Sequence, residues 1–311
     1  IISLGIPLAD GTFHDIIVGQ PDIASYIAHP NRYLGATVGR YCNRIANSTF
    51  TIDGQEYHVP ANESPNNLHT GPNGMYNKVW TVVKKEKNTA VFNLIQEDGL
   101  DGYPGKLDTT LTFNLDENNC LTMNYRATTT KPTVCNITNH AFFNLGSHDK
   151  VITDTLMTIN ADFWTPTDER LITSGEIRPV EGSVFDLRQG VKLSDVIDQK
   201  DPDLAKGGGF DHNFVLRKNF RGELSCAAIA KCEQTGITLE VWTTLPGVQF
   251  YSGNWLEVFP GKCHHSSNKR FAFCLEPQYF PDSPNKTHFP SPILRPGEEY
   301  NQTIQFKLHL N

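Results

Sequence analysis

Two segments of this 311-residue chain each carry one side chain suited to proton transfer. Segment 138–145 places His140 among apolar residues and beside Asn139 and Asn144, and segment 271–278 reads as an apolar strand that ends in Glu276. Burial makes the protonation of a histidine sensitive to its neighbours, and a partly buried carboxylate is unfavourable unless it is paired or used. Each residue also fits a structural role, so neither is decisive alone. Together they predict one proton donor and one proton acceptor.

Three further segments offer polar groups that could bind a hydroxyl-rich ligand, because every buried hydroxyl needs a hydrogen-bond partner. These are 39–45 with Arg40, Asn43 and Arg44, 65–71 with His69, and 207–214 with Asp211 after three glycines. The glycines let the backbone pass close to another group. Taken alone, each segment also fits a purely structural role: a surface turn with solvated arginines, a structural histidine, or an aspartate that caps a turn.

Other common catalytic motifs are missing from the sequence. It contains no Gly-x-Ser-x-Gly nucleophile, no dinucleotide fingerprint, no phosphate-binding Gly-Lys-Ser/Thr and no Cys-x-x-Cys pair. The adjacent His264 and His265 do not have the spacing of a HExxH zinc pair. The sequence therefore predicts acid/base chemistry on a neutral polyol, with no cofactor and no metal.

Composition excludes several classes of partner. The formal net charge is −7 with interspersed charges, which argues against nucleic-acid binding. We find no apolar run of about 18 residues and no signal peptide, so we expect no membrane span and a cytoplasmic location. Seven scattered cysteines favour free, mostly buried thiols in a reducing compartment. A monomer is the default expectation.

The elements that must position these side chains read as β-strands. Apolar and polar residues alternate over 121–127, 237–241 and 304–308, which is typical of strands with one buried face. Residues 50–59 read as a hairpin turning at Asp53-Gly54. One short helix is expected near 194–198, capped by Ser194, and loops over 62–77, 97–106 and 206–209. We therefore predict an all-β fold with very little helix, a large antiparallel β-sandwich in a single domain over residues 1–311.

Taken in order, these motifs resemble those of the aldose 1-epimerases, the galactose mutarotases. The resemblance runs from near residue 1 to near residue 308 and is carried by Gly39-Arg40-x-x-Asn43-Arg44-Ile45, Asn67-Leu68-His69-x-Gly71, Thr138-Asn139-His140-x-x-Phe143-Asn144-Leu145, Gly209-Phe210-Asp211-His212-Asn213 and Cys274-Leu275-Glu276-x-Gln278. Supporting stretches are Asp101-Gly102-Tyr103-Pro104-Gly105, Pro246-Gly247-Val248-Gln249-Phe250-Tyr251 and Leu294-Arg295-Pro296-Gly297-Glu298.

The resemblance implies a galactose mutarotase-like β-sandwich with the sugar in an open cleft. It also implies roles for particular residues: Glu276 as general base, His140 as general acid, and Asn43, Arg44, His69, Asp211 and Gln249 as residues that bind or position the sugar. Two departures stand near the site. Pro277 follows the base where family members often carry Thr, and Ala141-Phe142 stands where Ser-Tyr is also familiar.

The implied reaction is interconversion of the α and β anomers of a free aldohexose such as galactose or glucose. Three alternatives stay open: a hexose-6-phosphate epimerase with an anion site at Arg40 and Arg44, a glycosidase using Asp211 and Glu276, and a non-catalytic sugar-binding module. For activity at neutral pH we expect the anionic Asp211 and Glu276 to raise the pKa of His140, provided their attraction exceeds the cost of burial.

Overall fold

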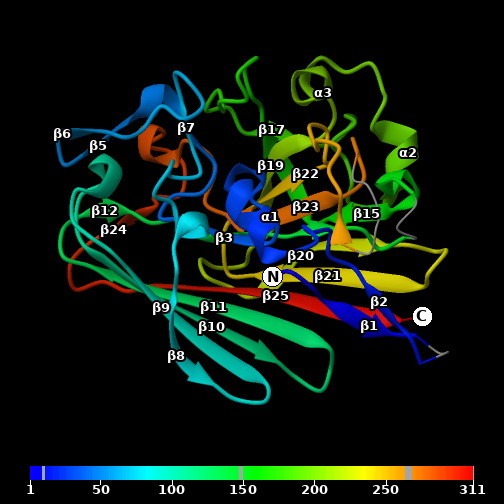
Figure 1. The fold of residues 1–311 in the computed structure, drawn as a ribbon. Helices are drawn as coiled ribbons and strands as arrows, with labels where there is room; N and C mark the ends of the chain where they lie inside the picture. The colour runs from blue at the N-terminus through cyan, green and yellow to red at the C-terminus, as the bar shows by residue number, and fades with distance from the viewer. Residues whose placement is uncertain (9–10, 147–149, 263–267, 311) are drawn as a thin grey trace.

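The computed structural model describes residues 1–8, 11–146, 150–262 and 268–310, and two antiparallel sheets dominate it (Figure 1). The larger sheet has nine strands in the order β18 (Val191–Lys192), β15 (Leu156–Ile159), β20 (Ser225–Lys231), β21 (Ile237–Thr243), β25 (Tyr300–Leu310), β11 (Cys120–Thr129), β10 (Leu107–Leu115), β9 (Thr89–Gln96) and β8 (Thr81–Lys85). The predicted strands at 121–127, 237–241 and 304–308 are confirmed as parts of β11, β21 and β25.

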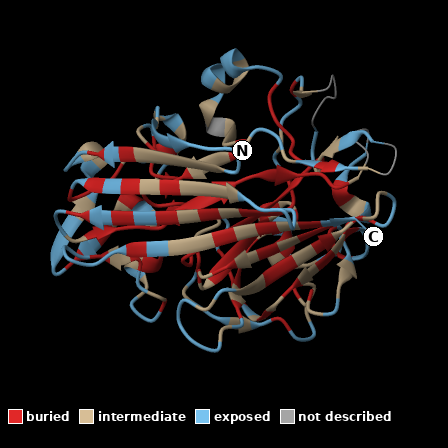
Figure 2. Cartoon of the chain, turned by 90° about the horizontal axis from the view of Figure 1, so that it is seen from below, coloured by how far each residue is buried: buried red, intermediate tan, exposed pale blue. Residues whose placement is uncertain are grey.

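Burial alternates along the strands of the nine-stranded sheet (Figure 2). In β11, Met123, Tyr125 and Ala127 are buried in the main apolar core, and the side chains between them are more exposed. Successive side chains of a strand point to opposite faces, so the alternation marks a sheet with one dry face.

The smaller sheet has six strands and packs against the same core. Its order is β14 (Phe142–Phe143), β23 (Phe273–Gln278), β22 (Gly247–Tyr251), β19 (Asp211–Leu216), β16 (Ala161–Thr165) and β17 (Arg178–Pro179). Phe214, Phe250 and Leu275 of this sheet belong to one apolar cluster with Leu111 and Met123 of the larger sheet. The result is two sheets joined by an apolar layer, in agreement with the predicted β-sandwich.

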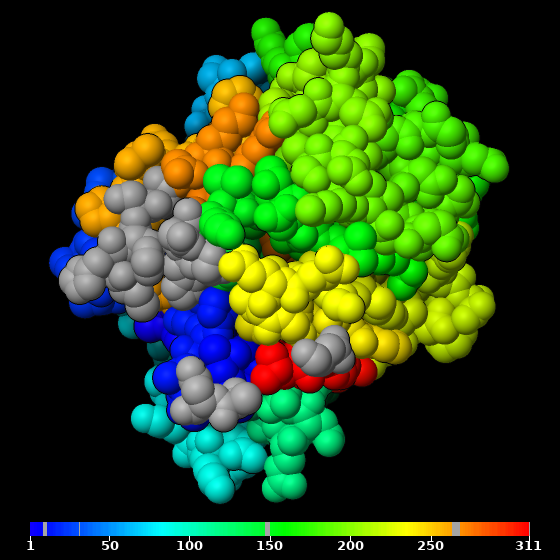
Figure 3. Space-filling view, turned by 90° about the vertical axis from the view of Figure 1, so that its right-hand side faces the viewer, coloured from blue at the N-terminus to red at the C-terminus, as the bar shows by residue number. Residues whose placement is uncertain are grey.

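Among the described residues, five two-stranded sheets surround these layers. They pair β1 (Gly5–Pro7) with β2 (Phe13–Asp15), β12 (Thr133–Val134) with β24 (Ile293–Leu294), β13 (Thr138–His140) with β3 (Ala36–Val38), β4 (Arg44–Ile45) with β7 (Asn67–Leu68), and β5 (Thr49–Ile52) with β6 (Gln55–His58). The predicted hairpin is the β5–β6 pair, and both Asp53 and Gly54 have the positive φ that its turn requires. Figure 3 shows the N-terminal strands, in blue, beside the C-terminal strand, in red.

Helices in the described residues are short: α1 (Ile23–Ala28), α2 (Leu193–Val196) and α3 (Pro202–Gly207), with 3₁₀ turns η1 (Pro30–Arg32), η2 (Ala46–Ser48), η3 (Met75–Asn77), η4 (Leu100–Gly102), η5 (Ile152–Asp154) and η7 (Ser283–Asn285). None of the described helices is long and apolar enough to cross a lipid bilayer.

The helix expected near 194–198 exists as α2, but its predicted cap is wrong. The N-cap is Lys192, and Ser194 lies inside the helix. The loop expected over 206–209 is also partly wrong, because α3 includes Lys206 and Gly207 and ends at Gly208 in the left-handed conformation.

Candidate active site

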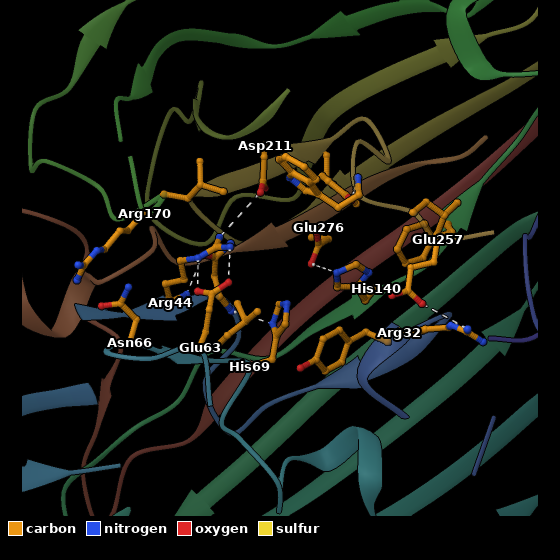
Figure 4. A pocket seen from close by; sticks show the side chains of 18 of the residues that line it. Arg32, Arg44, Glu63, Asn66, His69, His140, Arg170, Asp211, Glu257 and Glu276 are labelled. Atoms are coloured by element: carbon orange, nitrogen blue, oxygen red, sulfur yellow. Dashed lines mark hydrogen bonds and ion pairs between the residues drawn. The ribbon is translucent and has the colours of Figure 1, made fainter. Parts of the chain in front are cut away.

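A cleft of about 820 Å³ opens above the six-stranded sheet and collects residues from distant parts of the sequence (Figure 4). Six of the seven predicted site residues line it: Asn43, Arg44, His69, His140, Asp211 and Glu276. The seventh, Gln249, lies beneath Asp211, to which its Nε2 donates a hydrogen bond of 2.7 Å. Gln249 therefore supports a cleft residue and does not line the cleft.

Glu276 stands inside β23 and not at its end, which corrects the expectation from sequence. All residues of β23 are buried, and the strand alternates between two environments. Phe273 and Leu275 face the apolar core, so Cys274 and Glu276 share the opposite face. Pro277 continues β23 and lies opposite Val248 of β22. It comes after Cys274, the last residue of β23 that pairs with β14. The sheet thus places a carboxylate at the floor of the cleft with only 3% of its side chain exposed.

Glu276 faces His140, whose Nε2 lies 3.4 Å from the Glu276 Oε2. This contact is too long for a good hydrogen bond, and Oε2 has no hydrogen-bond partner among the described residues. A buried carboxylate oxygen without a partner is unfavourable in a protein that has no use for it. The gap is therefore suited to groups of a ligand that come between or beside the two side chains.

The His140 ring is fixed from its other sides. Phe142 stacks on it with ring centroids 5.0 Å apart, and the Cys274 Sγ lies 3.6 Å from its Nδ1. Phe142 keeps an aromatic face against the imidazole where Tyr is also familiar, whereas Ala141 is buried in the apolar core and does not line the cleft.

The protonation of the pair differs from the sequence-based prediction. Burial lowers the pKa of His140 to about 4, so the predicted rise of this pKa is wrong. Burial, and then the charge of Asp211, raises the pKa of Glu276 well above its usual value, while Arg44 opposes that shift. Removal of water disfavours both charged forms, and at Glu276 it outweighs the attraction of Arg44.

His69 occupies the loop after β7 in a left-handed conformation, with φ of 53°. The backbone N–H of Asn43 donates to its Nδ1 at 3.1 Å, so the neutral ring carries its proton on Nε2. Burial, and then the nearby His140 and Arg44, lowers the pKa of His69 well below 6.5. His69 is therefore a neutral donor held at one side of the cleft.

Arg44, Glu63, Asp211 and Gln249 form an ionic cluster at the other end of the floor. The Arg44 guanidinium donates two hydrogen bonds to Glu63, of 2.6 and 2.8 Å, and its Nη1 lies 3.9 Å from the Asp211 Oδ2. The attraction of Asp211 and Glu63 raises the pKa of Arg44 although burial alone would lower it. Burial raises the pKa of Asp211, against the opposing effects of Arg44 and Gln249.

Sequence reasoning missed most of the residues that line the cleft, and two of them, Glu63 and Tyr33, contact predicted site residues. Glu63 lies in the loop expected over 62–77, 19 positions after Arg44, and no sequence signal paired the two. Tyr33 packs edge-on against His69, with centroids 4.6 Å apart, and no motif marks it. Arg40, by contrast, does not line the cleft. It is buried and donates to the backbone oxygens of Pro104 and Gly105 at 2.9 and 2.8 Å. Arg40 therefore does not contribute to the anion site that the phosphosugar alternative would place at Arg40 and Arg44.

Ligand atoms of His69, His140 and Glu276 lie within 4.8 Å of one another, a spacing that a cation could bridge. His69 is a poor ligand in this arrangement, because the Asn43 N–H occupies its Nδ1 and leaves the proton on Nε2. The set suits hydroxyl groups better than a metal ion. His264 and His265 lie outside the described residues. The six described cysteines, Cys42, Cys120, Cys135, Cys226, Cys232 and Cys274, are free thiols.

Comparison with known proteins gives one consistent family. The family model described as aldose 1-epimerase matches residues 1–307. Galactose mutarotases of Rattus norvegicus and Homo sapiens are each 42% identical over 309 residues, which is 99% of this chain and 87% of theirs. The aldose 1-epimerase of Escherichia coli K12 is 34% identical over 99% of this chain and 88% of its own.

Solved structures give the same result. A GalM/aldose epimerase homologue from C. elegans superposes with a TM-score of 0.91 at 30% identity and covers all of this chain and 93% of its own. A galactose 1-epimerase from Lactobacillus acidophilus superposes with a TM-score of 0.83 at 26% identity, over 97% of this chain and 86% of its own.

Proposed function

The chain belongs to the aldose 1-epimerase family, and on that premise we propose that it interconverts the α and β anomers of free aldohexoses such as galactose and glucose. Glu276 is the general base and His140 the general acid. The observation that carries these roles is the buried Oε2 of Glu276, which has no hydrogen-bond partner among the described residues and faces the His140 Nε2 at 3.4 Å.

Anomerisation requires two proton movements on neighbouring sugar oxygens. The Glu276 carboxylate takes the proton of the anomeric hydroxyl while the His140 imidazolium gives a proton to the ring oxygen, and the C1–O5 bond breaks to leave an aldehyde. Rotation about C1–C2 presents the other face of the aldehyde. Ring closure then returns the protons, with His140 as base and Glu276 as acid, so protein and sugar regain their starting composition.

The pair can serve both directions because it holds one proton near neutral pH. Burial favours the neutral form of each group, because it raises the pKa of Glu276 well above its usual value and lowers the pKa of His140 to about 4. Transfer of this proton from the carboxyl to the imidazole gives the carboxylate base and the imidazolium acid without exchange with solvent. Sugar oxygens between the two side chains provide dipoles that replace the lost water and stabilise the charged arrangement.

The remaining cleft residues hold the sugar ring in register with the pair. His69 donates a hydrogen bond from Nε2, and Asp211 accepts hydrogen bonds from sugar hydroxyl groups. Arg44 and Asn43 present further donors. Gln249 keeps Asp211 in place. Fixing the ring so that the anomeric hydroxyl meets Glu276 and the ring oxygen meets His140 supplies the orientation that acid/base catalysis needs.

Two alternatives predict different substrates. A phosphosugar epimerase needs a cationic site for the phosphate. Arg40 is outside the cleft and Arg44 is paired with Glu63, so such a site would have to use Arg32, Arg170 or Lys206, which also line the cleft. A glycosidase would cleave a methyl glycoside, which has no free anomeric hydroxyl for Glu276 to deprotonate.

Polarimetry tests the proposed function. The protein should speed the rotation change of freshly dissolved α-D-galactose and α-D-glucose above the spontaneous rate, with little effect on glucose 6-phosphate. Methyl α-D-galactoside should stay intact. No acceleration with either free sugar would refute the proposal, and cleavage of the glycoside would favour a glycosidase.

A further inference from the structure

Gln278 is a fully buried polar residue that the proposed reaction does not use. It lies in β23, two residues after Glu276, with 0% of its surface exposed, and it does not line the cleft. Burial of an amide is unfavourable unless its oxygen and its nitrogen both have hydrogen-bond partners. The partners at its two ends therefore show what this side chain holds in place.

Three neighbouring strands place Gln278, Gln249 and Asp211 on one face of the six-stranded sheet. Gln249 of β22 lies directly opposite Glu276 of β23 and opposite Asn213 of β19. Residues directly opposite each other in a sheet share a face, and so do residues two apart in one strand. Gln278 and Asp211 therefore lie diagonally on either side of Gln249, on the face that carries Glu276.

Hydrogen bonds join these side chains in one direction. The Cys42 thiol donates to the Gln278 Oε1 at 3.6 Å, and the Gln278 Nε2 donates to the Gln249 Oε1 at 3.3 Å. The Gln249 Nε2 then donates to the Asp211 Oδ1 at 2.7 Å. Burial raises the pKa of the Cys42 thiol well above its usual value, so the thiol keeps the proton that it donates. Every polar atom of the two glutamine side chains thus has a partner, and the chain ends at a carboxyl oxygen.

The direction of this chain decides what Asp211 can do. Gln249 meets Asp211 with its N–H group because Gln278 donates to its oxygen. With the amide turned round, the Gln249 oxygen would face the carboxylate, and two acceptors would meet without a proton between them. The carboxyl group would then turn away or take up a proton, and either change makes it a poorer acceptor for hydroxyl groups. The observed direction binds Oδ1 to the protein and leaves Oδ2, 3.9 Å from the Arg44 Nη1, for the sugar.

We propose that Gln278 is a positioning residue of the sugar site, which acts through Gln249 to hold the Asp211 carboxylate as an acceptor for the sugar. Gln278 touches neither the sugar nor the reacting atoms, since it does not line the cleft. The inference rests on the proposed function, and it predicts that a substitution beneath the floor changes sugar binding only through Asp211.

A double-mutant cycle separates this role from simple packing. Gln278→Met removes the donor to Gln249 with little change of volume, and polarimetry should show that it lowers kcat/KM for galactose about fivefold, mainly through KM. In an Asp211→Ala background the same substitution should change kcat/KM less than about 1.5-fold, because the residue through which it acts is gone. Gln278→Leu removes the same donor with a different shape and repeats the cycle if Gln278→Met does not fold.

Gln96→Met is the matched control. Gln96 is also a buried glutamine, 2% exposed, and its Nε2 donates to the backbone oxygen of Asn73. It belongs to β9 of the nine-stranded sheet and does not line the cleft. Gln96→Met should lower the Tm, because it removes a buried hydrogen bond, and should leave kcat/KM for galactose unchanged.

Three results would overturn the positioning role. The first is an equal loss in the wild-type and Asp211→Ala backgrounds, which would show that Gln278 only supports the fold. The second is unchanged kinetics in a folded Gln278→Met. The third is failure of both Gln278→Met and Gln278→Leu to fold, which would give Gln278 a structural role alone. Each leaves the proposed function intact, because the wild-type protein would still speed the mutarotation of galactose. A wild-type protein without that activity would instead refute the proposed function.

Discussion

At one end of the cleft floor the members of the ionic cluster pair with one another, and at the other end Glu276 faces His140 at a distance too long for a good hydrogen bond. Arg44 donates twice to Glu63 and approaches Asp211, which also accepts from Gln249. The Glu276 Oε2 has no hydrogen-bond partner among the described residues. Arg44, Asp211 and Glu276 are all largely buried, with 10%, 13% and 3% of their side chains exposed, so the difference lies in how far the protein itself has satisfied the charge.

The pKa directions follow this difference. At the paired end, Asp211 and Glu63 raise the pKa of Arg44 against the effect of burial. At the unpaired end, burial prevails and favours a neutral acid in Glu276 and a neutral ring in His140. Arg44 thus stays charged and can hold a ligand, although burial also raises the pKa of its partner Asp211, whereas Glu276 and His140 can pass a proton to a ligand. The comparison assigns binding to the first end and chemistry to the second.

The largest expected effect is at the unpaired end. Glu276→Gln and His140→Asn should each lower kcat about 10³-fold, because each removes one of the two positioned proton transfers. Both substitutions nearly preserve shape, so circular dichroism and the Tm should show a folded protein. Near-normal kcat in either folded variant would remove that residue from the reaction.

Loss of binding groups should have a smaller effect. His69→Ala and Asp211→Ala should each lower kcat/KM about 10- to 100-fold, since a hydrogen bond to a charged or buried group contributes about 1.5–3 kcal/mol. Polarimetric kinetics across a range of galactose concentrations would separate KM from kcat. Unaltered kinetics in both variants would place these side chains outside the sugar contact.

Weakening the pairing of Glu63 with Arg44, at the outer part of the ionic cluster, should lower kcat/KM less than loss of His69 or Asp211. Glu63 has 36% of its side chain exposed, and its pairing with Arg44 is therefore partly screened by solvent. Glu63→Gln keeps one hydrogen-bond acceptor for Arg44 and should lower kcat/KM at most about fivefold. A loss of activity as large as that of Glu276→Gln would contradict the assignment of binding to the ionic cluster and of chemistry to Glu276 and His140.

Removal of metal ions should have no effect. The proton on the Nε2 of His69 makes the group of His69, His140 and Glu276 a poor cation site. Exhaustive treatment with EDTA should leave the polarimetric rate unchanged. A rate that falls and returns only with an added divalent metal would contradict acid/base chemistry by the side chains alone.

The sequence predicted the nine-stranded sheet better than the site. Strands β11 and β25 have one buried face, so the alternation of apolar and polar residues can be recognised in their sequences. β23 is buried throughout, and Pro277 read as a stop although the strand continues to Gln278. The helices α1 and α3 are too short for a periodic pattern, although Asp22 and Asp201 cap them and were readable signals.

The site residues were found through the order of their motifs, but their environment was not predictable from that order. Arg40 and Arg44 are four positions apart, yet one donates to buried backbone oxygens and the other lines the cleft. The nearby charges suggested that the pKa of His140 is raised. Burial lowers it instead, and a sequence does not show how completely water is removed from a side chain. The monomeric state and the cytoplasmic location stay predictions, since the fold of one chain determines neither.

The pH dependence of kcat/KM tests most directly whether Glu276 and His140 work as a pair that shares one proton. On the acid side the active state is lost when the second proton binds, and the lowered pKa of His140 puts this limb near about pH 4. On the alkaline side it is lost when the last proton leaves, and the raised pKa of Glu276 moves this limb up from the usual carboxyl range. Polarimetry from about pH 3.5 to pH 9, corrected for the spontaneous rate, should therefore give a broad plateau that includes neutrality. A rate that falls above about pH 6.5, as for an ordinary histidine acid, or that keeps rising through pH 9, would contradict the shared-proton pair.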